Sequence, residues 1–158
     1  MAKLVLIASF GALGAVTRYG VRRTAEYLSK ETTFFRFFDS WFDGGSHLKS
    51  TFISSVATLF SNGFAALLLG VIFAISLHWM HETPFFLSDD LHKMWINAAA
   101  IGFCGALSTF STFTEETFVF LEKGSLSLAV GNVAANLSVS LALFFFAYRF
   151  TFLFFRAS

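Results

Sequence analysis

Charged residues are scarce in this sequence. Asp, Glu, Lys and Arg together make up 13% of its 158 residues, whereas 56% of the residues are hydrophobic. Soluble domains carry about 25% charged and about 45–50% apolar residues. The shortage of charge therefore excludes an ordinary soluble domain and indicates a membrane protein. The formal net charge is only +1, so we expect no basic surface for nucleic acid.

Cysteine and proline are nearly absent, with one of each in the chain. The single thiol, Cys104, excludes an intrachain disulfide. The proline, Pro84, lies among polar residues between two apolar stretches and predicts a loop there. The four histidines fall at predicted loops and helix ends, which indicates interfacial positions and not an enzyme; they are His47, His78, His81 and His92.

Long apolar stretches dominate the rest of the chain. A membrane-spanning helix needs roughly 20 apolar residues, and backbone groups in hydrocarbon must be satisfied internally, so each such stretch is expected to be a helix. We predict transmembrane helices at about residues 4–21, 52–80, 94–121 and 126–155. The expected fold class is an all-α membrane protein, with residues 1–158 forming a single transmembrane domain in a cell membrane.

Residues 22–50 differ from these stretches because they carry too many charges to span a bilayer. Aromatic residues within this segment share one helical face, with charged residues off it: Phe34, Phe38, Trp41 and Phe42. This pattern predicts a short amphipathic helix lying in the membrane interface. An irregular connector anchored by aromatic residues at the interface is the alternative.

Lys and Arg are divided almost evenly between the two ends of the predicted bundle. On the side of the termini lie Lys3, Lys93, Arg149 and Arg156, and on the other side lie Arg22, Arg23, Lys30, Arg36, Lys49 and Lys123. Orientation in a membrane follows the asymmetry of these residues between the two sides. An asymmetry this weak permits insertion in both orientations.

Polar residues recur at helical spacing inside the apolar stretches. The second stretch has Thr58, Asn62, Ala66 and Gly70, and the fourth has Asn132, Asn136 and Ser140. Residues four apart share one face of a helix, and polar groups at membrane depth usually face a bundle interior or a water-filled path. The spacing leaves two interpretations open: a path for a solute, or hydrogen bonds that hold helices together.

The third stretch contains the densest polar segment, GFCGALSTFSTFTEE at residues 102–116. Glycine and hydroxyl residues weaken a helix, so we expect a break in mid-membrane near Gly105 to Ser108. Carbonyls freed there must be buried in protein or bind a cation. Phe110 and Phe113 share one face, and the positive edges of two rings can hold a small anion weakly. Lipid contact or packing is the alternative role for these rings.

The segment 102–116 resembles the third-helix signature of the Fluc (CrcB) fluoride channels, roughly G-x-x-G-G-x-T-T-F-S-T-F-x-x-E. Residues 11–19, GALGAVTRY, resemble the first-helix G-x-x-G-A-x-x-R-Y of that family. Residues 57–70 resemble its second-helix G-T-L-x-x-N-x-x-G-x-F-x-x-G. The resemblance implies a fluoride-selective passive channel that exports cytoplasmic fluoride and relieves its toxicity. It also implies an antiparallel, dual-topology homodimer with a central sodium ion that is structural and not transported.

The resemblance further implies roles for single residues. The ring edges of Phe110 and Phe113 would meet fluoride beside the amide of Asn62. The backbone carbonyls of Gly105 and Ser108 would bind the sodium ion. The remaining residues expected along the same path are Ser111, Thr112, Glu116 and Arg18, together with the polar residues of the fourth helix, Asn132, Asn136 and Ser140.

The sequence departs from the family pattern at several positions. Asn132 and Asn136 stand where the family usually has Tyr and Ser. Alanine replaces the usual glycine at Ala57, Ala65 and Ala106. Because Asn132 and Asn136 are also polar, the fourth helix keeps a polar face, but with side chains other than those usual in the family.

Two other functions are open to a protein of this size. A small multidrug transporter also has four helices and often dual topology, but it needs an intramembrane carboxylate for cationic substrates, whereas the first helix here offers Arg18. A non-transporting membrane assembly protein is the other alternative, and it would use the polar faces only to hold helices together.

Overall fold

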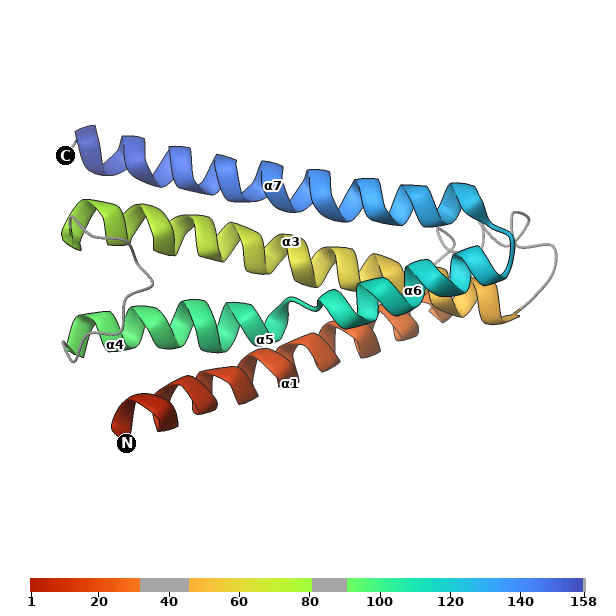
Figure 1. Ribbon diagram of the computed structural model, residues 1–158, viewed down its shortest axis with the longest axis horizontal. Coiled ribbons are helices and arrows are strands. Elements are labelled where there is room, and N and C mark those ends of the chain that lie inside the picture. Colours follow the sequence, from red (N-terminus) through yellow and green to blue (C-terminus); the bar gives the residue numbers. More distant parts are fainter. Residues whose placement is uncertain (32–45, 81–90, 158) are drawn as a thin grey trace.

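The computed structural model describes residues 1–31, 46–80 and 91–157, and within these ranges the chain forms a bundle of helices (Figure 1). The elements are α1 (Ala2–Glu31), α3 (Ser46–Met80), α4 (Leu91–Asn97), the π-helix η2 (Ala98–Cys104), α5 (Gly105–Leu107), α6 (Phe110–Glu122) and α7 (Leu126–Ala157). In this part of the chain, 4 helical segments are long and apolar enough to cross a membrane. The expectation of an all-helical fold with four spans is confirmed, and both termini lie at one end of the bundle.

The first helix is longer than the sequence predicted. We expected an end at about residue 21, but α1 continues to Glu31. Glu26 supports the added turns, because its carboxylate pairs with Arg22 at 3.3 Å and with Arg23 at 3.1 Å, and such pairs stabilise a helix. The helix thus extends into the segment expected to be a connector. The predicted interfacial helix from Phe34 to Phe42 falls outside the described residues.

Glycines set the distance between neighbouring helices. A Cβ placed on Gly14 of α1 would collide with the carbonyl oxygen of Phe103, and one on Gly102 would lie 2.6 Å from the carbonyl oxygen of Ile7. A Cβ on Gly70 of α3 would likewise collide with a backbone carbonyl of α7. Small residues allow such close backbone approach in membranes, where packing drives helix association. α1 therefore lies against the third span, and α3 lies against α7.

The third span is broken in its middle, as the sequence predicted. Gly105 remains helical (φ −64°, ψ −35°), and the backbone becomes extended at Ser108 (φ −71°, ψ 151°) and Thr109 (φ −147°, ψ 114°). α6 then begins at Phe110, and the thin link between α5 and α6 marks the break in Figure 1. The break follows from the hydroxyl of Thr109, which caps α6 by accepting from the N–H of Thr112.

A tight turn joins the third and fourth spans. Gly124 has a φ of 72°, a left-handed conformation that glycine adopts without steric cost. Its N–H donates to the carbonyl of Leu121 at 2.9 Å, and the N–H of Ser125 donates to the carbonyl of Phe120 at 2.8 Å. These bonds satisfy the end of α6 and place α7 antiparallel beside it.

Candidate functional site

The break in the third span redirects two backbone hydrogen bonds. In an unbroken helix the N–H of Thr109 would donate to the carbonyl of Gly105, and the N–H of Thr112 would donate to that of Ser108. Here the N–H of Thr109 donates to Oδ1 of Asn62 on α3 at 2.8 Å, and the N–H of Thr112 donates to Oγ1 of Thr109 at 3.3 Å. The carbonyls of Gly105 and Ser108 have therefore lost their helical donors.

These two carbonyls keep only long contacts. The hydroxyl of Ser108 donates to the carbonyl oxygen of Gly105 at 3.5 Å, and Nη1 of Arg18 donates to the carbonyl oxygen of Ser108 at 3.4 Å. No group of three or more His, Cys, Asp and Glu suited to a metal exists among the described residues. Backbone oxygens with spare lone pairs are ligands for hard cations. The carbonyl oxygens of Gly105 and Ser108 thus keep acceptor capacity at the break.

A groove of about 440 Å³ lies beside the break. Its lining includes the first two phenylalanines of α6, and the ring centroids of Phe110 and Phe113 are 5.6 Å apart with the rings inclined by 48°. The ring of Phe110 is largely open, with 78% of the residue exposed. Asn62 and Asn136 line the same groove, so amides from α3 and α7 meet the two rings in one place. Ser140, the next polar residue of α7, also lines it.

Three side-chain amides, those of Asn62, Asn136 and Asn132, form a continuous chain of hydrogen bonds, called the amide series below. It runs from α3 to α7 and ends on α6. Nδ2 of Asn62 donates to Oδ1 of Asn136 at 2.9 Å, and Nδ2 of Asn136 donates to Oδ1 of Asn132 at 3.0 Å. Nδ2 of Asn132 then donates to Oγ1 of Thr117 at 2.9 Å. The polar faces do bond helices together within one chain. Asn132 is buried and is not part of the groove's lining.

Glu116 lies one helical turn beyond Thr112, in the middle of α6. It is 4% exposed, and the hydroxyls of Ser54 and Thr58 donate to its Oε1 at 2.6 and 2.8 Å. Its Oε2 is buried without a hydrogen-bond partner among the described residues. Ser54 was not predicted to take part, although it lies one turn before Thr58 on the same predicted face. The third span therefore carries a carboxyl group that is buried within the bundle.

Two polar cavities lead along α6 to the break. One of about 910 Å³ is lined by Arg22, Glu26 and Lys30 of α1, by the start of α3 and by Glu116. The next, of about 230 Å³, is lined by Arg18 and Thr109 among others, and it shares Arg22, Ser54 and Thr112 with the first. Thr109 also lines the groove beside the phenylalanines. The three spaces thus succeed one another through shared residues.

Ser111, like Asn132, was expected along the path but lines none of these spaces. Ser111 is exposed, and its hydroxyl lies 3.3 Å from that of Thr109. Thr109 itself was not expected to take part, although a hydroxyl residue before a helical run is the ordinary signal for a cap.

These features define a small polytopic helical membrane protein whose third span is broken beside a groove of rings and amides. Residues 5–148 match the family described as "CrcB-like protein, Camphor Resistance (CrcB)". The chain belongs to this family, which confirms the resemblance drawn from its first three helices.

Relatives cover nearly the whole chain. The fluoride-specific ion channel FluC of Thermococcus gammatolerans is 36% identical over 148 residues, which are 93% of this chain and 94% of the relative. FluC of Pyrococcus horikoshii is 32% identical over 145 residues, 92% of each chain. FluC of Thermococcus onnurineus is 33% identical over 144 residues, 91% of each chain. These names describe ion channels and neither enzymes nor drug transporters.

Proposed function

We propose that this protein is a fluoride-specific channel of a cell membrane that lets cytoplasmic fluoride leak out passively. One observation carries the proposal: Phe110, Phe113 and Asn62 line a single groove beside the helix break. The relatives' names, which specify a fluoride-specific ion channel, supply the identity of the ion. Neither the groove nor the names point to a catalytic reaction.

The chemistry of the groove suits a small, strongly hydrated anion. A pore must replace the hydration shell closely and still let the ion leave. The edges of the Phe110 and Phe113 rings are weakly positive, and the N–H of the Asn62 amide is a stronger donor. Several weak donors in series hold fluoride without the deep trap that a formal positive charge would create.

The polar cavities on the other side of Thr109 would supply the remainder of the path. Arg18 contributes positive charge where the smaller cavity meets the break, and Thr112 contributes a hydroxyl to both cavities. Ser111 would reach the ion beside Thr112, and Ser140 would extend the groove on α7. Glu116, with Ser54 and Thr58, would line the wider end of the path.

Assembly with a second copy is part of the proposal. Phe110 is 78% exposed on the open side of the groove, so a single chain leaves the ring without a complete wall around an ion. An antiparallel homodimer with two pores would close both grooves. A sodium ion would then be held at the centre by the carbonyls of Gly105 and Ser108 from each copy, and it would stabilise the assembly without being transported.

An efflux measurement tests the proposal. The purified protein is reconstituted into liposomes loaded with potassium fluoride, and release is followed with a fluoride electrode after valinomycin is added. We expect fast fluoride release and, from liposomes loaded with potassium chloride, almost none. Fluoride release no faster than from protein-free liposomes would contradict the proposed function.

A further inference from the structure

The amide series described above has a defined direction. An Asn side chain offers one oxygen acceptor and two N–H donors, and the two ends of the amide are usually assigned from their partners. At the start of the series the partner is the backbone N–H of Thr109, which can only donate, so the group of Asn62 that meets it must be Oδ1. The other end of that amide, Nδ2, then faces Asn136.

A second backbone group fixes the direction independently. Nδ2 of Asn136 donates at 3.0 Å to the backbone carbonyl of Asn132, which can only accept, and at 3.0 Å to Oδ1 of the same residue. Oδ1 of Asn136 must therefore point to Asn62. Both ends of the series require the same orientation, so neither amide can be turned around without losing bonds to the backbone.

The direction determines which polar atoms the groove meets. The side-chain oxygens of Asn62, Asn136 and Asn132 all accept within the series. The second N–H of Asn62 has no acceptor among the described residues, and Asn62 lines the groove. An amide oxygen carries partial negative charge and repels an anion, whereas an N–H attracts it. The series thus presents a donor to the groove and keeps its oxygens occupied.

We propose that Asn132 is a positioning residue which never contacts the ion but orients the Asn136 amide, and through it Asn62, so that the groove selects anions. This inference rests on the proposed function and adds to it the source of selectivity at the α7 side of the groove. Asn132 is 8% exposed and lies outside the groove lining. Its anchor is Thr117, whose hydroxyl in turn donates to the carbonyl of Phe113 at 2.8 Å. The series therefore also ties the ring-bearing part of α6 to α7.

Two substitutions that remove the same link test this role. Asn132→Leu removes the side-chain oxygen that accepts from Nδ2 of Asn136 and leaves only the backbone carbonyl of residue 132 as its acceptor. Thr117→Val removes the acceptor for Asn132 while keeping the side-chain shape and all three amides. We expect fluoride efflux to fall about tenfold in Asn132→Leu and about threefold in Thr117→Val, as for contacting residues in one network. The ratio of fluoride to chloride permeability should fall in both, which a packing defect alone would not cause.

The double variants show whether the residues act together. Thr117→Val should have no further effect in the Asn132→Leu background. The control is Ser140→Ala, because Ser140 lies on the same face of α7 but outside the amide series. In the double variant, the reductions in fluoride efflux caused by Ser140→Ala and Asn132→Leu should multiply. Size-exclusion chromatography verifies folding, and if Asn132→Leu does not fold, the milder Thr117→Val variant decides the matter.

Three results would overturn the inference. The first two are a fluoride flux and a permeability ratio equal to those of the parent in Asn132→Leu, or in Thr117→Val. The third is a flux in the double variant that falls by the product of the two single reductions. The two levels of failure are distinct. A parent protein that releases no fluoride contradicts the proposed function itself. A parent that conducts while both variants match it contradicts only the role of Asn132.

Discussion

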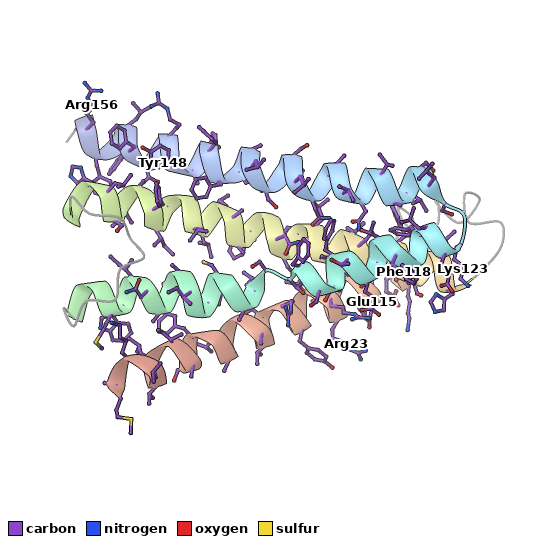
Figure 2. All side chains as sticks on the ribbon, in the orientation of Figure 1. Arg23, Glu115, Phe118, Lys123, Tyr148 and Arg156 are labelled. Atoms are coloured by element: carbon purple, nitrogen blue, oxygen red, sulfur yellow. The ribbon has the colours of Figure 1, made fainter. Side chains whose placement is uncertain are left out.

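Phe110 and Phe113 are the residues on which the proposed selectivity depends. Their rings lie 5.6 Å apart on adjacent turns of α6 and face the groove that Asn62 lines. A phenylalanine differs from an aliphatic residue of similar bulk in the weakly positive edge of its ring. The same α6 also carries Phe118, which is 64% exposed and lies toward the other end of the helix, near Glu115 (Figure 2).

Replacing either groove ring by isoleucine should abolish most of the conductance. Phe110→Ile and Phe113→Ile keep bulk and apolarity but remove the ring edge, and we expect fluoride efflux from liposomes to fall by about two orders of magnitude, equivalent to nearly 3 kcal/mol of barrier. Phe118→Ile, the matched control on α6, should conduct like the parent. A Phe110→Ile, Phe113→Ile double variant with the parental rate would show that the rings only pack.

Thr109 acts on stability through its side chain. Its hydroxyl accepts from the N–H of Thr112 at 3.3 Å and so caps α6. Thr109→Val keeps the shape and removes this acceptor, which should cost about 1 kcal/mol and lower the thermal midpoint in detergent. Thr114→Val is the control, because the exposed Thr114 hydroxyl only donates to a carbonyl of its own helix. Equal midpoints for the two variants would argue against the cap.

At the scale of elements, the third span is two helical segments joined at Ser108 and Thr109. The π-helix η2 precedes the break, and the N–H of Gly105 donates to the carbonyls of both Ala100 and Gly102. Short π-helical segments are frequent at functional sites because they shift the helical register. Close packing on α1 through Gly14 and Gly102 holds the first segment in place. The second segment is held instead by side-chain hydrogen bonds to α3 and α7.

The contact between α1 and η2 should tolerate no added carbon. Gly102→Ala would place a Cβ 2.6 Å from the carbonyl oxygen of Ile7 and 2.9 Å from Cβ of Phe10. We expect a loss of about 1–3 kcal/mol, typical of overpacking, seen as a lower thermal midpoint. Gly20→Ala in α1 meets nothing within 4 Å and should leave the midpoint unchanged or raise it. Equal midpoints for the two variants would show that α1 does not pack this closely.

Sodium should stabilise the broken span if the carbonyls of Gly105 and Ser108 bind it. A ligand that binds only the folded protein raises stability with its concentration, by about 2.7 kcal/mol at a hundredfold excess over Kd. The thermal midpoint in sodium chloride should therefore exceed that in N-methylglucamine chloride of equal ionic strength. Thermal midpoints that are identical in the two salts at every concentration would contradict the proposed sodium site.

On the scale of the whole molecule, basic residues lie at both ends of the bundle. Both termini and Arg156 lie at one end in Figures 1 and 2, whereas Arg23 and Lys123 lie at the other. The sequence predicts only a weak asymmetry of Lys and Arg between these two ends. Weak asymmetry of this kind is compatible with insertion in either direction, which an antiparallel homodimer requires.

A reporter at the C-terminus tests dual insertion. Fusions to a reporter active only in the cytoplasm and to one active only outside it should both give signal in the same host. Adding three lysines beside Arg156 should shift the population toward one orientation, because orientation follows the Lys and Arg bias. A parent fusion seen on one side alone, with all of the protein accounted for, would contradict dual topology.

Periodicity in the sequence was enough to predict the four spans, but neither the end of α1 nor the π-helix η2. Runs of apolar residues predicted the four spans, and the glycine and hydroxyl residues of segment 102–116 predicted the break near Ser108. These properties are local: hydrocarbon enforces helices, and a few neighbouring side chains decide where a helix fails. The predicted end of α1 at about residue 21 was wrong for a related reason. The charged residues that follow were predicted to form a connector, but ion pairs of Glu26 with Arg22 and Arg23 stabilise them as part of the helix.

Only the tertiary structure decided which polar groups meet. Spacing placed Asn132 and Asn136 on one face. It could not reveal that Asn136 bonds to Asn62, 74 positions away, or that Asn132 bonds to Thr117 and does not line the groove. Those partners depend on the rotation and depth of α3, α6 and α7 relative to one another, which close contacts such as that of Gly70 with α7 determine. The direction of the amide series, and hence the donor that the groove presents, exists only once these helices have packed.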